Sequence, residues 1–121
     1  MRRLLGLIAL SVLLAAAIPA ADLSGVWKGQ FDFGGQPVPV TLTMKVAGDA
    51  LTGKVEGLQT TPVEMQEGKI AGDSVTFWIT TDYQGTNYKI VYKGKVAGDE
   101  IRFTFGTEDG SWGAEMVVKR T

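Results

Sequence analysis

Three near-copies of one five-residue pattern constrain the fold of this chain more than any other feature. Lysine, an aliphatic residue, alanine, glycine and aspartate follow one another at residues 45–49, 69–73 and 95–99. Apolar and polar residues alternate on both sides of each Gly-Asp pair, which is typical of two strands joined by a two-residue turn with glycine first. The pattern therefore predicts three β-hairpins.

The hairpins imply a strand register that places apolar residues opposite one another on one face. A fourth two-residue turn at Gln84-Gly85 extends the same pattern. The predicted partners are Val46 with Leu51, Ile70 with Val75, Val96 with Ile101, Thr81 with Tyr88, Ile79 with Ile90, and Phe77 with Tyr92.

Further strands before and after the hairpins complete an all-β domain. An opening strand at 25–33 turns at Gly34-Gly35, and a closing strand occupies 112–120, which makes about eight strands in meander order. Residues 56–68 are the least regular part, where Pro62 and a slip in alternation near Gln66-Glu67 predict a loop and a bulge. We expect an eight-stranded antiparallel up-and-down barrel, because closure removes exposed strand edges, with a two-sheet sandwich as the alternative.

The two faces of the predicted strands differ in polarity. The outward face carries lysines, threonines and acidic residues, which argues against a lipid-facing barrel. The bulk of the inward residues favours a packed interior over a hollow one. The inward residues are Trp27, Phe31, Phe33, Val38, Val40, Leu42, Met44, Leu51, Val55, Phe77, Ile79, Ile90, Phe103, Phe105 and Met116.

The first twenty residues have the features of an export signal. Arg2 and Arg3 form a positive start, an apolar run from Leu4 follows, and small residues precede a predicted cut after Ala20. The apolar run is too short to span a bilayer. We therefore expect a signal peptide of the bacterial Sec type at 1–20, a single β-barrel domain at 22–121, a periplasmic or secreted location, and no membrane span after cleavage.

Composition narrows the possible functions. Removal of residues 1–20 leaves 10 basic and 13 acidic side chains, a net charge of 10 − 13 = −3, which does not suit nucleic-acid binding. The chain has no histidine and no cysteine, so it lacks the commonest general base, the commonest metal ligand and the thiol nucleophile. We expect a protein that is not an enzyme and that needs no metal or cofactor.

Carboxylates are the remaining candidates for catalysis or calcium binding. Glu64 with Glu67, and Asp82 with Glu108 and Asp109, are the nearest pairs, and Asp49, Asp73 and Asp99 recur in the Gly-Asp turns. All of them are also explained as solvated turn and rim acids.

Two short motifs resemble the lipocalin and avidin superfamily of small barrels. Gly25-Val26-Trp27 resembles the opening strand of that superfamily, and residues 48–53 are similar to the second hairpin of avidin-type proteins. The resemblance implies that Trp27 plugs one barrel end and that Arg120, on the closing strand, packs over it. Gly29 occupies the position of a polar biotin ligand in avidins, so biotin binding is not implied.

The mature chain as a whole more closely resembles short bacterial secreted domains with the pattern SGxWxGxF…VPxxL…LTGxV. Similar modules are attached to hydrolases. This resemblance implies a fold and a compartment, and it implies no activity.

Two pairs of residues are candidates for binding. Trp78 and Val91 face outward opposite one another. They could contact a protein partner, a second subunit or a flat carbohydrate face, or pack together to stabilise the sheet. Tyr88 and Tyr92 face inward, where their hydroxyls need partners in a polar cavity or on rim backbone.

The main hypothesis is a non-catalytic exported module that binds a small apolar or amphipathic ligand at the barrel mouth or a protein partner on its outer face. The alternative is a structural or inhibitor-like envelope protein that acts through protein–protein contact.

Overall fold

Strands occupy most of the part of the chain that the computed structural model describes, residues 23–121. The predicted signal peptide lies outside the described residues. The strands are β1 (Gly25–Phe33), β2 (Gln36–Ala47), β3 (Ala50–Glu56), β4 (Val63–Glu64), β5 (Gln66–Ala71), β6 (Ser74–Tyr83), β7 (Thr86–Ala97), β8 (Glu100–Thr107) and β9 (Gly113–Arg120). A helix that could span a bilayer is absent from residues 23–121.

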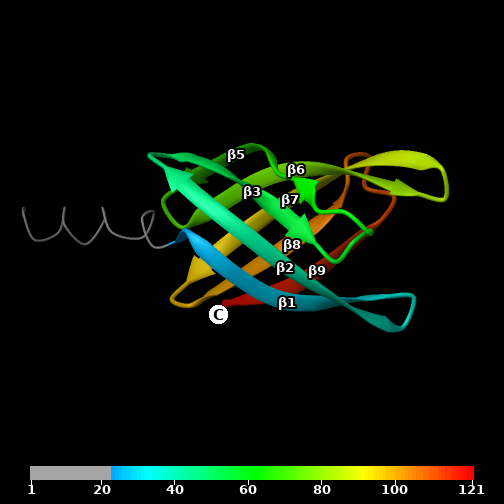
Figure 1. Cartoon of the computed structure of the whole chain (residues 1–121), viewed down its shortest axis with the longest axis horizontal. Helices are drawn as coiled ribbons and strands as arrows, with labels where there is room; N and C mark the ends of the chain where they lie inside the picture. The colour runs from blue at the N-terminus through cyan, green and yellow to red at the C-terminus, as the bar shows by residue number, and fades with distance from the viewer. Residues whose placement is uncertain (1–22) are drawn as a thin grey trace, which may run out of the picture.

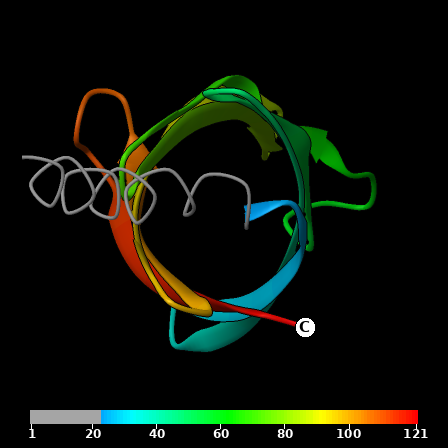
Figure 2. The same ribbon diagram turned by 90° about the vertical axis from the view of Figure 1, so that its left-hand side faces the viewer.

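The strands form a closed antiparallel barrel. Strands pair with their neighbours in the chain, except that β4 and β5 both pair with β3, and β1 pairs with both β2 and β9, which closes the ring (Figures 1 and 2). Short β4 and β5 are consecutive parts of one interrupted strand between β3 and β6, so the barrel has eight strands. The predicted barrel is confirmed, and the two-sheet alternative is wrong.

The predicted register holds in every hairpin. Val46 pairs with Leu51, and Ile79 pairs with Ile90; the other four predicted pairs are also observed. The first residue of the Gly-Asp turn at Gly48 has φ +66°, a conformation that glycine adopts without a Cβ penalty. At the Gln84-Gly85 turn both central residues have positive φ, as in a type I′ turn.

The repeated Gly-Asp turns also tie neighbouring hairpins together. The carbonyl of each turn aspartate accepts a backbone hydrogen bond from a residue in a following strand: Asp49 from Ile70 at 2.9 Å, Asp73 from Val96 at 2.8 Å, and Asp99 from Arg120 at 3.0 Å. Within residues 23–121 no Gly-Asp turn precedes the first repeat, and the Val46 amide donates instead to Ser24 Oγ at 3.0 Å. The repeat therefore sets contacts between hairpins as well as the turns themselves.

The irregular segment takes the predicted form of a loop and a bulge. Residues 57–62 form the loop, and the register of β5 on β6 shifts between Gln66 and Lys69. Glu67 has φ +48°, the local distortion that accommodates the extra residue.

Most of the predicted inward residues form the core, with two exceptions. Phe33 is 40% exposed and Val38 is half-buried, because both line a cavity at the open end of the barrel. The core also contains buried residues outside the predicted inward set, among them Leu23, Val63, Met65 and Val118.

Candidate functional site: a cavity at the open end of the barrel

The two ends of the barrel are built differently. The three Gly-Asp turns lie at one end, and the Gly34-Gly35 turn, the 57–62 loop, the Gln84-Gly85 turn and the β8–β9 loop lie at the other (Figure 1). At the Gly-Asp end Trp27 is fully buried, and its Nε1 donates to the Leu23 carbonyl at 3.0 Å. The Arg120 guanidinium lies over the Trp27 ring, 4.3 Å from its centroid, as the resemblance implies. We call this the plugged end.

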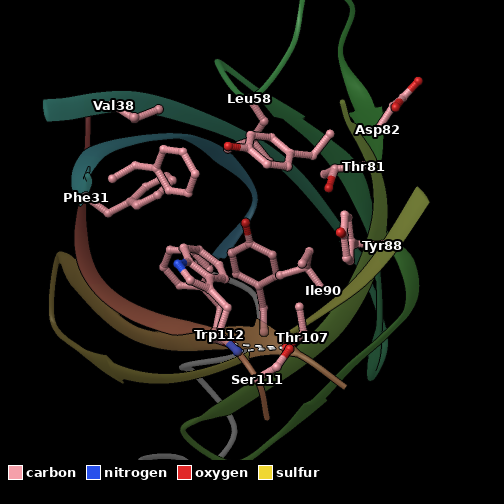
Figure 3. A pocket seen from close by; sticks show the side chains of 14 residues that line it. Phe31, Val38, Leu58, Thr81, Asp82, Tyr88, Ile90, Thr107, Ser111 and Trp112 are labelled. Atoms are coloured by element: carbon pink, nitrogen blue, oxygen red, sulfur yellow. Dashed lines mark hydrogen bonds between the residues drawn. The ribbon is translucent and has the colours of Figure 1, made fainter. Parts of the chain in front are cut away.

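The opposite end contains a cavity of about 420 Å³. We call it the mouth cavity. It is within the size range of sites that hold small molecules. Figure 3 shows Phe31, Ile90 and Trp112 directed into it. Its lining residues are Phe31, Phe33, Val38, Leu58, Thr81, Asp82, Tyr83, Tyr88, Ile90, Tyr92, Phe105, Thr107, Ser111 and Trp112.

The cavity corrects the expectation of a packed interior. Bulky side chains such as Phe77 and Phe103 fill the barrel between the plugged end and the cavity floor. Beyond that level the remaining aromatic side chains stand around the wall and leave a space between them. The barrel is therefore packed in one half and hollow in the other.

A stack of three aromatic rings holds Tyr92 at the boundary between these halves. Tyr92 lies between Phe77 on β6 and Phe105 on β8, with both ring centroids at 4.6 Å and interplanar angles of 12° and 3°. Phe103 contacts Phe77 and Tyr92 edge-on. The direct cross-strand pairing of Phe77, Tyr92 and Phe105 places the rings side by side, so the orientation of the tyrosine is fixed.

Burial changes the chemistry of Tyr92. The side chain is 1% exposed, and burial raises the pKa of its phenol well above the ordinary value. The hydroxyl is therefore a neutral hydrogen-bonding group at neutral pH.

The β8–β9 loop positions Trp112 on the cavity wall. Thr107 Oγ1 accepts from the Trp112 amide at 3.0 Å, and the Thr107 amide donates to the Trp112 carbonyl at 2.9 Å. Asp109 Oδ1 accepts from the Ser111 amide at 3.0 Å and from Ser111 Oγ at 2.8 Å. These bonds, with the backbone amide of Ser111 first, lower the pKa of Asp109. The loop is thus a hydrogen-bonded unit that fixes the indole.

Aromatic contacts continue from Trp112 to the rim. Trp112 packs edge-on against Phe31, Phe33 and Phe105, with centroid distances of 5.8 to 6.3 Å. Phe33 in turn packs edge-on against Tyr83 at 5.8 Å. Edge-to-face contacts keep these side chains against the wall instead of letting them collapse into the cavity.

The tyrosines that the sequence singled out occupy different levels of this cavity. Tyr92 is on the floor, whereas Tyr88 is at the mouth with 37% of its surface exposed. Both lie on the inward side of β7. The structure thus brings the two predicted inward tyrosines to one cavity.

The predicted outward pair Trp78 and Val91 lies directly opposite across β6 and β7. Both side chains are half-buried. Trp78 Nε1 donates to Glu67 Oε2 at 2.9 Å, and Lys89 Nζ lies 4.5 Å from the centroid of the indole. Lys89 also pairs with Glu108 at 3.1 Å. The indole is covered by its neighbours, as expected of a cross-strand packing pair.

Most of the candidate carboxylates have separate hydrogen-bond or ion-pair partners. Glu67 accepts from Trp78, Glu108 pairs with Lys89, and Asp109 accepts from Ser111. Asp82 Oδ1 accepts from the Gly85 amide at 3.1 Å, and Glu64 is exposed on β4. Across residues 23–121 no group of three or more acidic side chains is placed to hold a metal ion.

Several cavity residues were missing from the sequence-based site, chiefly Phe33, Tyr83 and Trp112. A signal for them exists in the turns. Alanine precedes each Gly-Asp turn, as at Ala47, whereas Phe33, Tyr83 and Trp112 adjoin the connections of the opposite end. A concentration of aromatic residues beside the turns and loops of one end therefore indicates which end of the barrel contains the aromatic-lined cavity.

Comparison with known proteins adds one structural similarity. The chain matches no family model and no curated protein. Among solved structures it is similar to a "secretary abundant heat soluble (SAHS) protein" of Ramazzottius varieornatus, with 14% identity and a TM-score of 0.46 over 82% of this chain and 95% of the other. The barrel topology described above rests on the strand pairing of this chain alone.

Proposed function

We propose that this protein is an exported, non-catalytic binding protein that holds a small apolar or amphipathic ligand in the mouth cavity. The observation that supports it most is the cavity itself: a space of about 420 Å³, open at one end and mostly apolar, in a barrel whose other end is plugged. Export is supported by the signal-like residues 1–20, and the absence of catalysis by the lack of histidine and cysteine in the chain.

We also propose that the barrel is of the lipocalin-like type. The Gly25-Val26-Trp27 motif, the Arg120 contact over Trp27 and one plugged barrel end support it together. The covered position of Trp78 gives less support to a partner site on the outer face, because Glu67 and Lys89 already contact the indole.

The proposal is tested by filling the cavity. Thr81 lines the cavity, and its neighbour Thr80 faces outward and is exposed, so the same substitution at the two positions forms a matched pair. The probe is N-phenyl-1-naphthylamine, an uncharged apolar dye whose fluorescence rises on leaving water. We expect the wild type and Thr80→Trp to bind it alike and Thr81→Trp to bind it about tenfold or more weakly, since a buried indole occupies the space.

Thermal unfolding of both variants is the control for folding. The proposal would be overturned if the wild type failed to bind the dye, or if a folded Thr81→Trp bound it as tightly as Thr80→Trp.

A further inference from the structure

One polar group in the mouth cavity lacks the partner that its burial demands. Within residues 23–121 the Tyr92 hydroxyl makes no hydrogen bond to the protein, and its oxygen is not sealed in the core but reaches the cavity surface. Buried tyrosine hydroxyls usually find a partner, because an unmade hydrogen bond leaves the cost of desolvation unrepaid. A phenylalanine at this position would make the same stack with Phe77 and Phe105 without that cost.

The other polar groups deep in the cavity are already in use. Thr107 Oγ1 interacts with Ser111 Oγ at 3.1 Å, and Ser111 Oγ with Asp109 at 2.8 Å. Asp82 Oδ1 accepts from the Gly85 amide, and Figure 3 shows the Asp82 carboxylate directed away from the cavity. Thr81 also lines the cavity without a hydrogen bond within residues 23–121, but it is only half-buried, so Tyr92 is the most deeply buried polar group that remains available to a ligand.

The lining also determines which ligand charge the cavity can accept. Among the described lining residues none is a lysine or arginine, and the chain has no histidine. Two basic side chains near the barrel ends are engaged outside the cavity: Lys89 contacts Trp78 and Glu108 on the outer face, and Arg120 lies over Trp27 at the plugged end. A buried anion without a cationic partner loses its hydration with little in return.

We infer that the mouth cavity selects uncharged ligands that place a hydrogen-bond acceptor, such as a carbonyl, against the Tyr92 hydroxyl, and that it rejects anionic ones such as carboxylates. The inference rests on the proposed function and adds the chemical class of the ligand. The aromatic stack holds the donor in one orientation before the ligand enters, so little freedom is lost on binding.

Three probes of nearly equal shape test the inference. They are 2-acetylnaphthalene, which is uncharged and carries a carbonyl; 2-ethylnaphthalene, which has no acceptor; and 2-naphthoate, which is an anion at neutral pH. Their dissociation constants are measured by calorimetry with the wild type and Tyr92→Phe. Unfolding curves verify that Tyr92→Phe is at least as stable as the wild type, as expected if the lost hydroxyl had no partner.

We expect Tyr92→Phe to weaken 2-acetylnaphthalene about tenfold, because its carbonyl is left unpaired, and to change 2-ethylnaphthalene by less than about twofold. Wild type should bind 2-naphthoate about a hundredfold or more weakly than 2-acetylnaphthalene. Tyr88→Phe, which removes a hydroxyl at the solvent-exposed mouth, should weaken 2-acetylnaphthalene less than Tyr92→Phe does.

The outcomes separate the inference from the proposed function. The inference is wrong, and the cavity remains a binding site, if both uncharged probes bind and Tyr92→Phe changes their affinities by the same factor or not at all. The same conclusion follows if 2-naphthoate binds the wild type as well as 2-acetylnaphthalene does. If neither the naphthalenes nor N-phenyl-1-naphthylamine binds the wild type, the proposed function is wrong and the inference fails with it.

Discussion

Trp27 and Tyr92 are both deeply buried aromatic residues, but their polar atoms have different surroundings. The Trp27 indole N–H is satisfied by the Leu23 carbonyl and its ring face by Arg120, so every part of the side chain has a structural partner. The Tyr92 ring is equally well packed, yet its hydroxyl faces the cavity without a partner within residues 23–121. This difference supports our proposal that the hydroxyl of Tyr92 contacts a ligand, whereas the contacts of Trp27 are all within the fold.

The buried phenol should also make stability depend on alkaline pH. In the unfolded chain Tyr92 ionises around its ordinary value of 10.0, whereas burial raises its pKa in the folded state. Below pH 10.0 Tyr92 keeps its proton in both the folded and the unfolded state, so its ionisation does not change the free energy of unfolding. As the pH rises above it only the unfolded state loses the proton, so the free energy of unfolding falls.

Replacing Tyr92 with phenylalanine removes this dependence. Urea unfolding of the wild type and Tyr92→Phe at about pH 8 and about pH 11 should show the variant gaining stability relative to the wild type at the higher pH. An identical change in both proteins would show that Tyr92 ionises as easily in the folded state as in the unfolded chain.

At the scale of strands and turns, the repeated Gly-Asp pattern was the main basis for predicting which strands pair and in which register. Alternation and the two-residue turns specified the partners in each hairpin, because a slip of one residue would turn every apolar side chain outward. The sequence could not show that the turn aspartates bond through their carbonyls to the following hairpin, as Asp49 does with Ile70. Backbone atoms carry no sequence signal, and the contact emerges only when the strands are placed side by side.

Ser24 provides a test of this contact at the first repeat, where a side chain replaces the missing turn. Ser24→Ala leaves the Val46 amide without its hydrogen bond and should lower the free energy of unfolding by about 0.5 to 1 kcal/mol. Ser74 is a matched control, since within residues 23–121 its side chain makes no hydrogen bond. Chemical denaturation of both alanine variants measures the difference; equal stability would contradict a structural role for the Ser24 hydroxyl.

At the scale of the whole molecule, the sequence predicted the closed barrel but not the distribution of space inside it. The inward residues are bulky along the whole chain, which suggested a filled interior. In the structure Phe77, Tyr92 and Phe103 pack together in the core. At the open end, Phe31 and Phe33 each pack edge-on against Trp112 and leave a space between the walls. Whether large side chains fill a barrel or line it depends on their mutual angles, and residue identity does not specify those angles.

The three tryptophans of the chain lie at three different places, which makes them natural reporters of where a ligand binds. Trp27 is at the plugged end, Trp78 is on the outer face, and Trp112 lines the mouth cavity. In a two-dimensional ¹H–¹⁵N spectrum each gives its own indole N–H signal. All three candidate regions can therefore be followed in one titration.

The most direct test of the binding account is this titration with N-phenyl-1-naphthylamine. The account predicts that the Trp112 indole signal moves to saturation with the dye while the Trp27 and Trp78 signals stay in place. Movement of the Trp78 signal without that of Trp112 would contradict the account and would place binding on the outer face of the barrel.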